Sequence, residues 1–191
     1  GVIMSQVNFE NRTVIVTGAG NGLGKAYALE FANRGANVVV NDLGGSVDGT
    51  GEGSTPADNV VNEIKESGGN AVANYDSVAT KEGGQNIVDT ALETFGGLDA
   101  VVNNAGILRD KSFLKMTEDD LNLVLDVHLK GTFYVCQPAF AHMKEKGYGR
   151  FVNVASPSGL FGTFGQLNYG AAKMGIVGLT NVMSIEGAKY N

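Results

Sequence analysis

Short apolar runs rich in β-branched residues alternate along the chain with longer segments in which apolar residues recur every three or four positions. The short runs predict buried strands, at residues 13–18, 37–42, 70–76, 98–106 and 149–156. The longer segments predict helices, at residues 23–35, 60–69, 86–97, 117–147 and 168–190. Because strand and helix alternate throughout, we expect an α/β fold with a doubly wound parallel sheet, in a single domain over residues 1–191.

Composition narrows the class of protein. The chain has 191 residues, 43% of them apolar, which suits one domain with a sizeable core. Its net charge is −6 and no basic cluster is present, so we expect no nucleic-acid partner. No apolar run approaches a membrane span of ~18 residues, and the first residues lack the pattern of a secretory signal. Cys136 is the only cysteine and the two histidines lie far apart, so neither a disulfide nor a metal site is expected.

Glycine is unusually frequent, with 28 residues in the chain. Residues 42–55, "DLGGSVDGTGEGST", are polar and rich in glycine. We expect a long loop at the carboxyl edge of the sheet, where ligands bind in folds of this class. The alternative is a floppy surface insertion without a function.

A second glycine cluster, "TGAGNGLG", lies between the first expected strand and the first expected helix. Its spacing is T-G-x-x-x-G-x-G, not the strict G-x-G-x-x-G, because Leu23 occupies the sixth position. Glycines allow the backbone to turn sharply and approach a pyrophosphate, and a helix N-terminus offers free N–H groups. We therefore predict dinucleotide binding by Gly18, Gly22, Leu23 and Gly24.

Asp42 ends the second expected strand. A carboxylate at this place accepts hydrogen bonds from the 2′-hydroxyl of an adenosine ribose and repels the 2′-phosphate of NADP. No arginine or lysine lies nearby in the sequence to offset that charge. The residue favours NAD as cofactor; the alternative is that Asp42 is only a turn residue.

Tyr169 and Lys173 lie four positions apart, at the start of the last expected helix. Positions i and i+4 share a face of a helix, and a nearby cation favours the phenolate form of a tyrosine. Ser156 ends the fifth expected strand, where its hydroxyl can orient a substrate oxygen; Ser158 is a competitor for this role. The three residues predict a proton-transfer site beside a dinucleotide, whereas a surface Tyr–Lys pair and a loop serine are the alternative.

Together these residues resemble the short-chain dehydrogenase/reductase family. The motifs that match are "TGAGNGLG", "NNAG" at 103–106, and Ser156 with "YGAAK" at 169–173, in order along nearly the whole chain. The resemblance implies a Rossmann-type fold and a nicotinamide cofactor, with Tyr169 as acid/base and Lys173 also bonding the nicotinamide ribose. It further implies that an adenine pocket is lined by Asp76, Ser77 and Val78. By the same resemblance, the backbone of Asn104 lies against the cofactor.

Within the family, the segments "VVVNDLGG", "NNAGILRDKSF" and "SPSGLFGTFGQLNYGAAKMG" look like the dehydrogenase units of peroxisomal multifunctional enzymes of type 2. This resemblance implies NAD-dependent oxidation of (3R)-3-hydroxyacyl-CoA to 3-ketoacyl-CoA. It also implies a homodimer packed through the long helices, and a peroxisomal matrix location in a eukaryote or a cytoplasmic one in a bacterium. The alternatives are a 3-oxoacyl-carrier-protein reductase, a hydroxysteroid dehydrogenase, or an inactive fragment that only binds nucleotide.

Two features depart from the family pattern. His128, in "DVHLKG", stands where many members carry an asparagine that anchors a proton-relay water. His128 is therefore a candidate catalytic residue, since its unperturbed pKa is ~6.5, or else it holds the helix by a hydrogen bond. The chain also stops where the family enters its sixth strand, so we expect it to lack the C-terminal strands that complete the substrate pocket.

Overall fold

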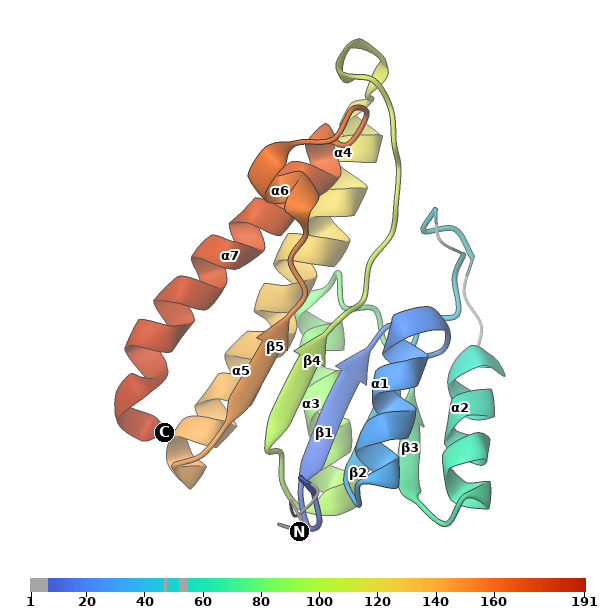
Figure 1. Ribbon diagram of the computed structural model, residues 1–191, viewed down its shortest axis with the longest axis vertical. Helices are drawn as coiled ribbons and strands as arrows, with labels where there is room; N and C mark the ends of the chain where they lie inside the picture. Colours follow the sequence, from blue (N-terminus) through green and yellow to red (C-terminus); the bar gives the residue numbers. More distant parts are fainter. Residues whose placement is uncertain (1–6, 47, 52–54) are drawn as a thin grey trace, which may run out of the picture.

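The computed structural model describes residues 7–46, 48–51 and 55–191. Five parallel strands form one sheet in the order β3-β2-β1-β4-β5 (Figure 1). The strands are β1 (Thr13–Thr17), β2 (Asn37–Asn41), β3 (Asn70–Asn74), β4 (Ala100–Asn103) and β5 (Arg150–Asn153). The strand order reverses direction at β1, which places a crevice between the loops that follow β1 and β4. The doubly wound parallel sheet expected from the sequence is confirmed.

Helices connect successive strands and cover both faces of the sheet (Figure 1). The α-helices are α1 (Gly22–Asn33), α2 (Thr55–Glu66), α3 (Lys81–Phe95), α4 (Glu118–Leu125), α5 (Gly131–Lys146), α6 (Pro157–Phe161) and α7 (Leu167–Gly187). Three shorter segments complete the pattern: η1 (Phe113–Lys115), the π-helical η2 (Asp126–Lys130) and η3 (Ala188–Tyr190). Figure 1 shows β5, α5 and α7 running side by side along one edge of the molecule.

Alternate residues of the central strands point to opposite faces, so each face has its own apolar core. Val14 and Val16 of β1 pack with residues of α1 and α2, such as Ala28 and Ile64. Ile15, between them, packs into a second cluster formed by α3 and α5. All five residues of β1 are buried, as expected for a central parallel strand covered on both faces.

A buried carboxylate braces the amino end of the sheet. Asp99, which is 3% exposed, accepts hydrogen bonds from the Thr13 backbone N–H (2.8 Å), from Arg12 (2.8 Å) and from the Lys146 ammonium (2.9 Å). Burial opposes ionisation of this carboxyl, but the three donors outweigh it and hold the pKa of Asp99 below its usual value. The brace joins β1, the start of β4 and the end of α5.

The sequence predictions differ from the structure mainly in helix continuity. The helix expected over 117–147 divides into α4, the π-helical η2 and α5. Its start is fixed by a capping box, in which Thr117 accepts from the Asp120 N–H and Asp120 accepts from the Thr117 N–H. The helix expected at 60–69 begins earlier, at Thr55, with Pro56 in its first turn. The short helix α6 had not been predicted.

Two classes of feature are not found in the part of the chain that the structure describes. None of its helices combines the length and the apolarity of a membrane span. None of its His, Cys, Asp and Glu residues gather in groups of three or more that could hold a metal ion.

Candidate dinucleotide and catalytic site

The glycine turn after β1 is packed too tightly for side chains at Gly18, Gly20 and Gly24. A Cβ on Gly18 (φ +62°) would lie 2.8 Å from the Ala105 Cα, and a Cβ on Gly24 would lie 2.1 Å from the Gly18 carbonyl oxygen. Gly22 (φ +55°) is different, because a Cβ there would meet no atom within 4 Å. Gly18 and Gly24 therefore close the turn against the sheet, whereas Gly22 faces open space that a pyrophosphate can approach.

The N-terminus of α1 is unlike those of α3 and α4. Asn21 at its N-cap makes no side-chain cap, and the first turn holds no acidic residue. By contrast, Thr80 caps α3 and Thr117 caps α4, each with an acidic residue in the first turn. The α1 amides are thus not satisfied by a side-chain cap, which fits an external anion such as a phosphate.

Asp42 follows β2 and lies beside this turn. Its carboxylate accepts hydrogen bonds from the backbone N–H of Gly20 (2.8 Å, to Oδ2) and from that of Gly44 (2.7 Å, to Oδ1). The side chain is half-buried and lines the cleft, so it remains accessible from the side on which a ribose would lie.

The cleft has a volume of about 390 Å³ and extends from the glycine turn along the carboxyl ends of β2, β3 and β4. Most of the predicted cofactor residues line it, namely Gly18, Gly22, Asp42, Asp76, Ser77, Val78 and Asn104. The other predicted cofactor residues are not in this lining: Gly24 is buried inside the turn, Leu23 is 65% exposed in the first turn of α1, and Tyr169 and Lys173 lie in α7. The described part of the glycine-rich loop, including Ser46 and Gly49, forms another wall of the cleft. Its position at the carboxyl edge of the sheet agrees with the sequence prediction.

Side chains at the strand ends hold the walls of the cleft in place. Asn41 donates to Asn74 (2.9 Å) and to the Asp76 carbonyl (2.9 Å), which fixes the wall of the cleft that follows β3. The Thr17 hydroxyl accepts from the Asn104 N–H at 3.0 Å, and the Asn104 amide donates to the Thr17 carbonyl at 3.2 Å. The "NNAG" segment is thereby bonded to the end of β1.

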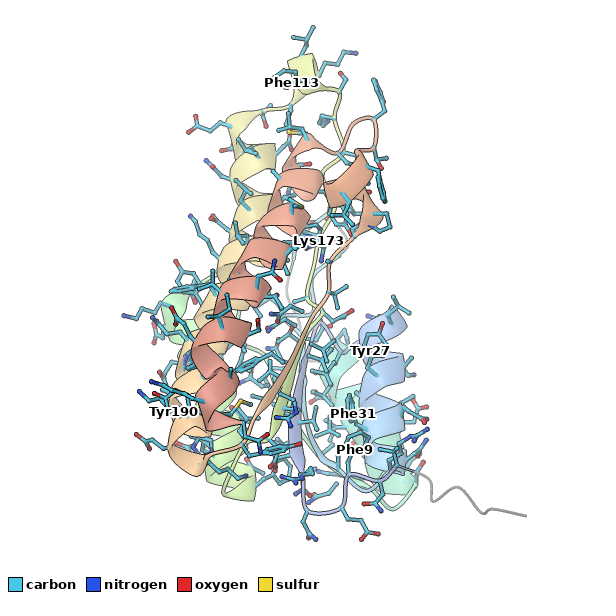
Figure 2. The ribbon with its side chains drawn as sticks, turned by 60° about the vertical axis from the view of Figure 1, so that its left-hand side comes forward. Phe9, Tyr27, Phe31, Phe113, Lys173 and Tyr190 are labelled. Atoms are coloured by element: carbon cyan, nitrogen blue, oxygen red, sulfur yellow. The ribbon has the colours of Figure 1, made fainter. Side chains whose placement is uncertain are left out.

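Tyr169 and Lys173 lie one turn apart in α7, as predicted, and Lys173 is almost fully buried. The Lys173 ammonium lies 5.6 Å from the centroid of the Tyr169 ring and donates to the Val154 carbonyl at 2.6 Å. Figure 2 shows Lys173 between α7 and the chain that leaves β5. Burial lowers the pKa of Lys173 from 10.5 to about 8.

Ser156 lies two residues beyond Val154 and caps α6. Its hydroxyl accepts from the Ser158 N–H at 3.2 Å. The hydroxyl of Ser158, the competing serine, instead bonds Gln166 at 2.9 Å. α6 packs closely on the first turns of α7, since a Cβ on Gly159 would lie 2.9 Å from the Met174 nitrogen. The end of β5 thus brings Ser156 to the part of α7 that carries Tyr169 and Lys173.

His128 lies in the π-helical turn η2 and is 3% exposed. Its ring meets that of Tyr169 edge-on, with centroids 5.2 Å apart. Nε2 lies 3.0 Å from the Ile107 nitrogen and 2.8 Å from the Ile107 oxygen, and Nδ1 has no partner among the described residues. Burial, together with the Lys173 cation, lowers the pKa of His128 from 6.5 to about 4, so the ring is neutral near pH 7.

Sequence reasoning missed several residues that shape the site. Gly106 makes room for the histidine, because a Cβ there would lie 2.4 Å from the His128 Cε1. Asn168 donates to the Arg109 carbonyl (2.9 Å), and Arg109 in turn donates to the Asp48 carbonyl (2.7 Å), which joins α7 to the glycine-rich loop. Of these residues, only Gly106 had a signal in the sequence, because it is the last residue of the "NNAG" motif. The contacts of Arg109 and Asn168 join residues far apart in the chain, so no local pattern reports them.

The sheet order, the glycine turn and the cleft at the strand ends define a fold of the Rossmann type. The family model described as short chain dehydrogenase matches residues 12–191. The chain therefore belongs to the short-chain dehydrogenase family, as the sequence motifs indicated.

Individual relatives agree with this assignment. A short-chain type dehydrogenase/reductase of Mycobacterium tuberculosis is 59% identical over 95% of this chain, and peroxisomal multifunctional enzyme type 2 of Mus musculus is 57% identical over 98%. Among solved structures, a short chain dehydrogenase from Mycobacterium avium matches with a TM-score of 0.89 at 46% identity over 96% of this chain. The full-length peroxisomal multifunctional enzyme type 2 from Drosophila melanogaster matches with a TM-score of 0.81 at 48% identity over 97%.

The chain spans only part of each relative. It covers 64% of the Mycobacterium tuberculosis protein and 25% of the mouse enzyme. It covers 65% and 30%, respectively, of the Mycobacterium avium and Drosophila chains of known structure.

Proposed function

We propose that this domain oxidises (3R)-3-hydroxyacyl-CoA to 3-ketoacyl-CoA with NAD, using Tyr169 as the acid/base. One observation carries the proposal: Tyr169 and the buried Lys173 lie one turn apart in α7, and the end of β5 brings Ser156 to the same part of that helix. The cleft of the same molecule begins at the uncapped N-terminus of α1. A buried cation beside a tyrosine, close to a dinucleotide cleft, is the arrangement that proton transfer coupled to hydride transfer requires.

The residues present fit a nicotinamide dinucleotide. Gly22 leaves open space beside uncapped amides for the pyrophosphate, and Asp42 presents a carboxylate to the adenosine ribose. Asp76, Ser77 and Val78 would enclose the adenine, with Asn104 along the middle of the cofactor. Bound NAD would supply the hydride acceptor for the alcohol carbon.

Two side chains would act on the substrate oxygen, and a third would act on Tyr169 and the cofactor. Tyr169 as phenolate takes the hydroxyl proton of the alcohol, and Ser156 donates a hydrogen bond that holds the same oxygen. Lys173 stabilises the phenolate by its charge and bonds the nicotinamide ribose. Because Lys173 now donates to the Val154 carbonyl, its side chain already points toward the end of β5 that carries Ser156.

For His128 the geometry favours bracing over proton relay. Its lowered pKa, about 4, makes the charged form costly at neutral pH, and Nε2 is engaged by the backbone of Ile107. We infer that His128 holds the segment after β4 against η2 and supports the ring of Tyr169 from the side.

The acyl-CoA substrate rests on the likeness to the peroxisomal multifunctional enzymes, which covers nearly the whole chain at 53–57% identity. The main rival, an NADPH-linked 3-oxoacyl-carrier-protein reductase, needs a basic pocket for the 2′-phosphate. Asp42, held in the cleft by two backbone amides, disfavours that reading.

We also propose a homodimer that packs through α5 and α7. Phe133 of α5 and Val182 and Ile185 of α7 are 45%, 56% and 78% exposed, respectively. Exposed apolar side chains on neighbouring helices are typical of an interface between subunits. Sedimentation of a Val182→Lys variant should show a shift toward monomer; an unchanged dimer would place the interface elsewhere.

The first experiment is a titration of the chain with NADH and with NADPH, followed by nicotinamide fluorescence. We expect saturable binding that prefers NADH, and then oxidation of 3-hydroxyacyl-CoA in the presence of NAD. Tyr169→Phe should abolish turnover and retain NADH binding, because only the proton-transferring hydroxyl is removed. Near-normal turnover by Tyr169→Phe would refute the assignment of Tyr169, and failure to bind either cofactor would refute a complete dinucleotide site in these residues.

A further inference from the structure

Gly20 is buried within the turn after β1 but is not one of the three glycines of the T-G-x-x-x-G-x-G pattern. Its backbone N–H donates to Oδ2 of Asp42 at 2.8 Å. This amide is therefore committed to the carboxylate, and the phosphates must be bound by other amides of the turn and of α1.

The space at Gly20 is filled by the same carboxylate. A Cβ on Gly20 would lie 2.7 Å from both Cγ and Oδ2 of Asp42, and 2.7 Å from Cβ of Pro56. Gly20 is not among the glycines with positive φ, so its backbone conformation is open to any residue. The need for glycine here arises from packing alone, because the Asp42 side chain and the first turn of α2 occupy the position of a side chain.

A second contact fixes the carboxylate from the other side. The N–H of Gly44 donates to Oδ1 of Asp42 at 2.7 Å, and the N–H of Ala19 donates to the Asn41 carbonyl at 2.9 Å. The glycine turn and the end of β2 are thus bonded on both sides of Asp42. Each carboxylate oxygen keeps a further lone pair for a ligand, because an ionised carboxylate offers about four acceptor sites.

We propose that Gly20 is a specificity-determining residue, which fixes the Asp42 carboxylate in the orientation that accepts a ribose 2′-hydroxyl and excludes a 2′-phosphate. This inference rests on the proposed use of NAD. It adds that the charge of Asp42 discriminates between the two cofactors only when the carboxylate is held in the space that a side chain at position 20 would fill. A carboxylate free to rotate could turn away from a 2′-phosphate, and discrimination would weaken.

The test compares the NADH:NADPH affinity ratio of the unmodified chain with those of Gly20→Ala, Asp42→Ala and the double variant. Gly20→Ala should lower the ratio about tenfold, a change of ~1.4 kcal/mol in relative binding. The double variant should show no larger loss than Asp42→Ala alone, since the glycine acts through the carboxylate. Gly97→Ala is the matched control, because its Cβ would meet only the end of Lys146, at 3.6 Å, far from the cleft.

Asp42→Glu tests the same point without adding a side chain to the turn. It retains the charge on a longer arm that does not fit the space at Gly20, so the ratio should again fall. An unchanged ratio in Asp42→Glu would show that charge alone suffices and would overturn the inference, even if Gly20→Ala failed to fold. If Asp42→Ala itself leaves the ratio unchanged, the proposed NAD preference fails. If Asp42→Ala lowers the ratio and Gly20→Ala does not, only the role of Gly20 fails.

Discussion

The burial of His128 predicts a specific loss of stability on mild acidification. The folded protein binds a proton at His128 only near pH 4, whereas the unfolded chain binds one near pH 6.5. Between these values the unfolded state holds more protons, so the free energy of unfolding rises with pH and falls on acidification. The contribution is fully present above pH 6.5 and is lost as the pH decreases toward 4.

The magnitude follows from the two pKa values. At pH 5 the unfolded state gains about 2 kcal/mol from protonation that the folded state does not, and at pH 7 it gains only ~0.2 kcal/mol. The chain should therefore lose about 2 kcal/mol of stability between pH 7 and pH 5 through this residue. Most carboxylates remain ionised in this range, so their contribution is small.

The assay is urea unfolding of the unmodified chain and of His128→Gln at pH 7 and at pH 5. The variant will be less stable at pH 7, because the contacts with Ile107 and Tyr169 are altered. Between pH 7 and pH 5, its free energy of unfolding should nevertheless fall by about 2 kcal/mol less than that of the unmodified chain. An equal pH dependence in His128→Gln and the unmodified chain would show that His128 is not held neutral, and would restore proton relay as its role.

Three further changes test the packing of the fold and the site. Gly106→Ala should cost about 1–3 kcal/mol in urea unfolding, because its Cβ would overlap the His128 ring, and the cost should shrink in a His128→Ala background; equal costs in both backgrounds would remove the contact from the explanation. Asp99→Ala should cost about 2–3 kcal/mol at pH 7, since it leaves the Thr13 N–H and Lys146 without their acceptor. The difference from wild type should diminish as the pH falls from ~4 through the lowered pKa of the folded state, because the carboxyl is protonated in the unfolded chain first; a difference that does not depend on pH would contradict the lowered pKa. Thr117→Ala should cost ~1 kcal/mol by removing the cap of α4, measured by thermal unfolding, and no loss would mean that water replaces the cap.

The overall fold could be predicted from the sequence because its signals are local and repeated. β1 and β2 are apolar runs ending at a turn residue, and α2 and α3 have clear helical spacing. The π-helical turn at Asp126–Lys130 could not be predicted, because a shift of backbone bonding from i−4 to i−5 leaves no mark in hydrophobic periodicity. The helix α6 was too short to show a period, although Ser156 followed by Pro157 is a typical start.

Some features of the candidate site could likewise be predicted from the sequence, and others could not. Tyr169 and Lys173 could be predicted as a pair because residues four positions apart in a helix lie on the same face. The tight contacts of Gly20 with Asp42 and of Gly106 with His128 join residues 22 positions apart in both pairs, and only the folded chain shows which atoms meet. The same holds for the neutral state of His128, which depends on burial that no single segment of sequence reports.

The strand order also determines when the protein can begin to work during its synthesis. β1 pairs with β2 soon after both have been made, but its other neighbour is β4, where Val14 pairs with Ala100. Domains generally fold as the chain emerges, and pairings distant in sequence form late. The β1–β2–β3 half can therefore assemble early with one side of β1 unpaired, and the cleft wall formed by Thr17 and Asn104 closes only after β4 docks. A nascent chain that ends before β4 would expose the unpaired edge of β1 and lack the Asn104 side of the cleft, so the interval before β4 docks is when the chain is most open to edge-to-edge association.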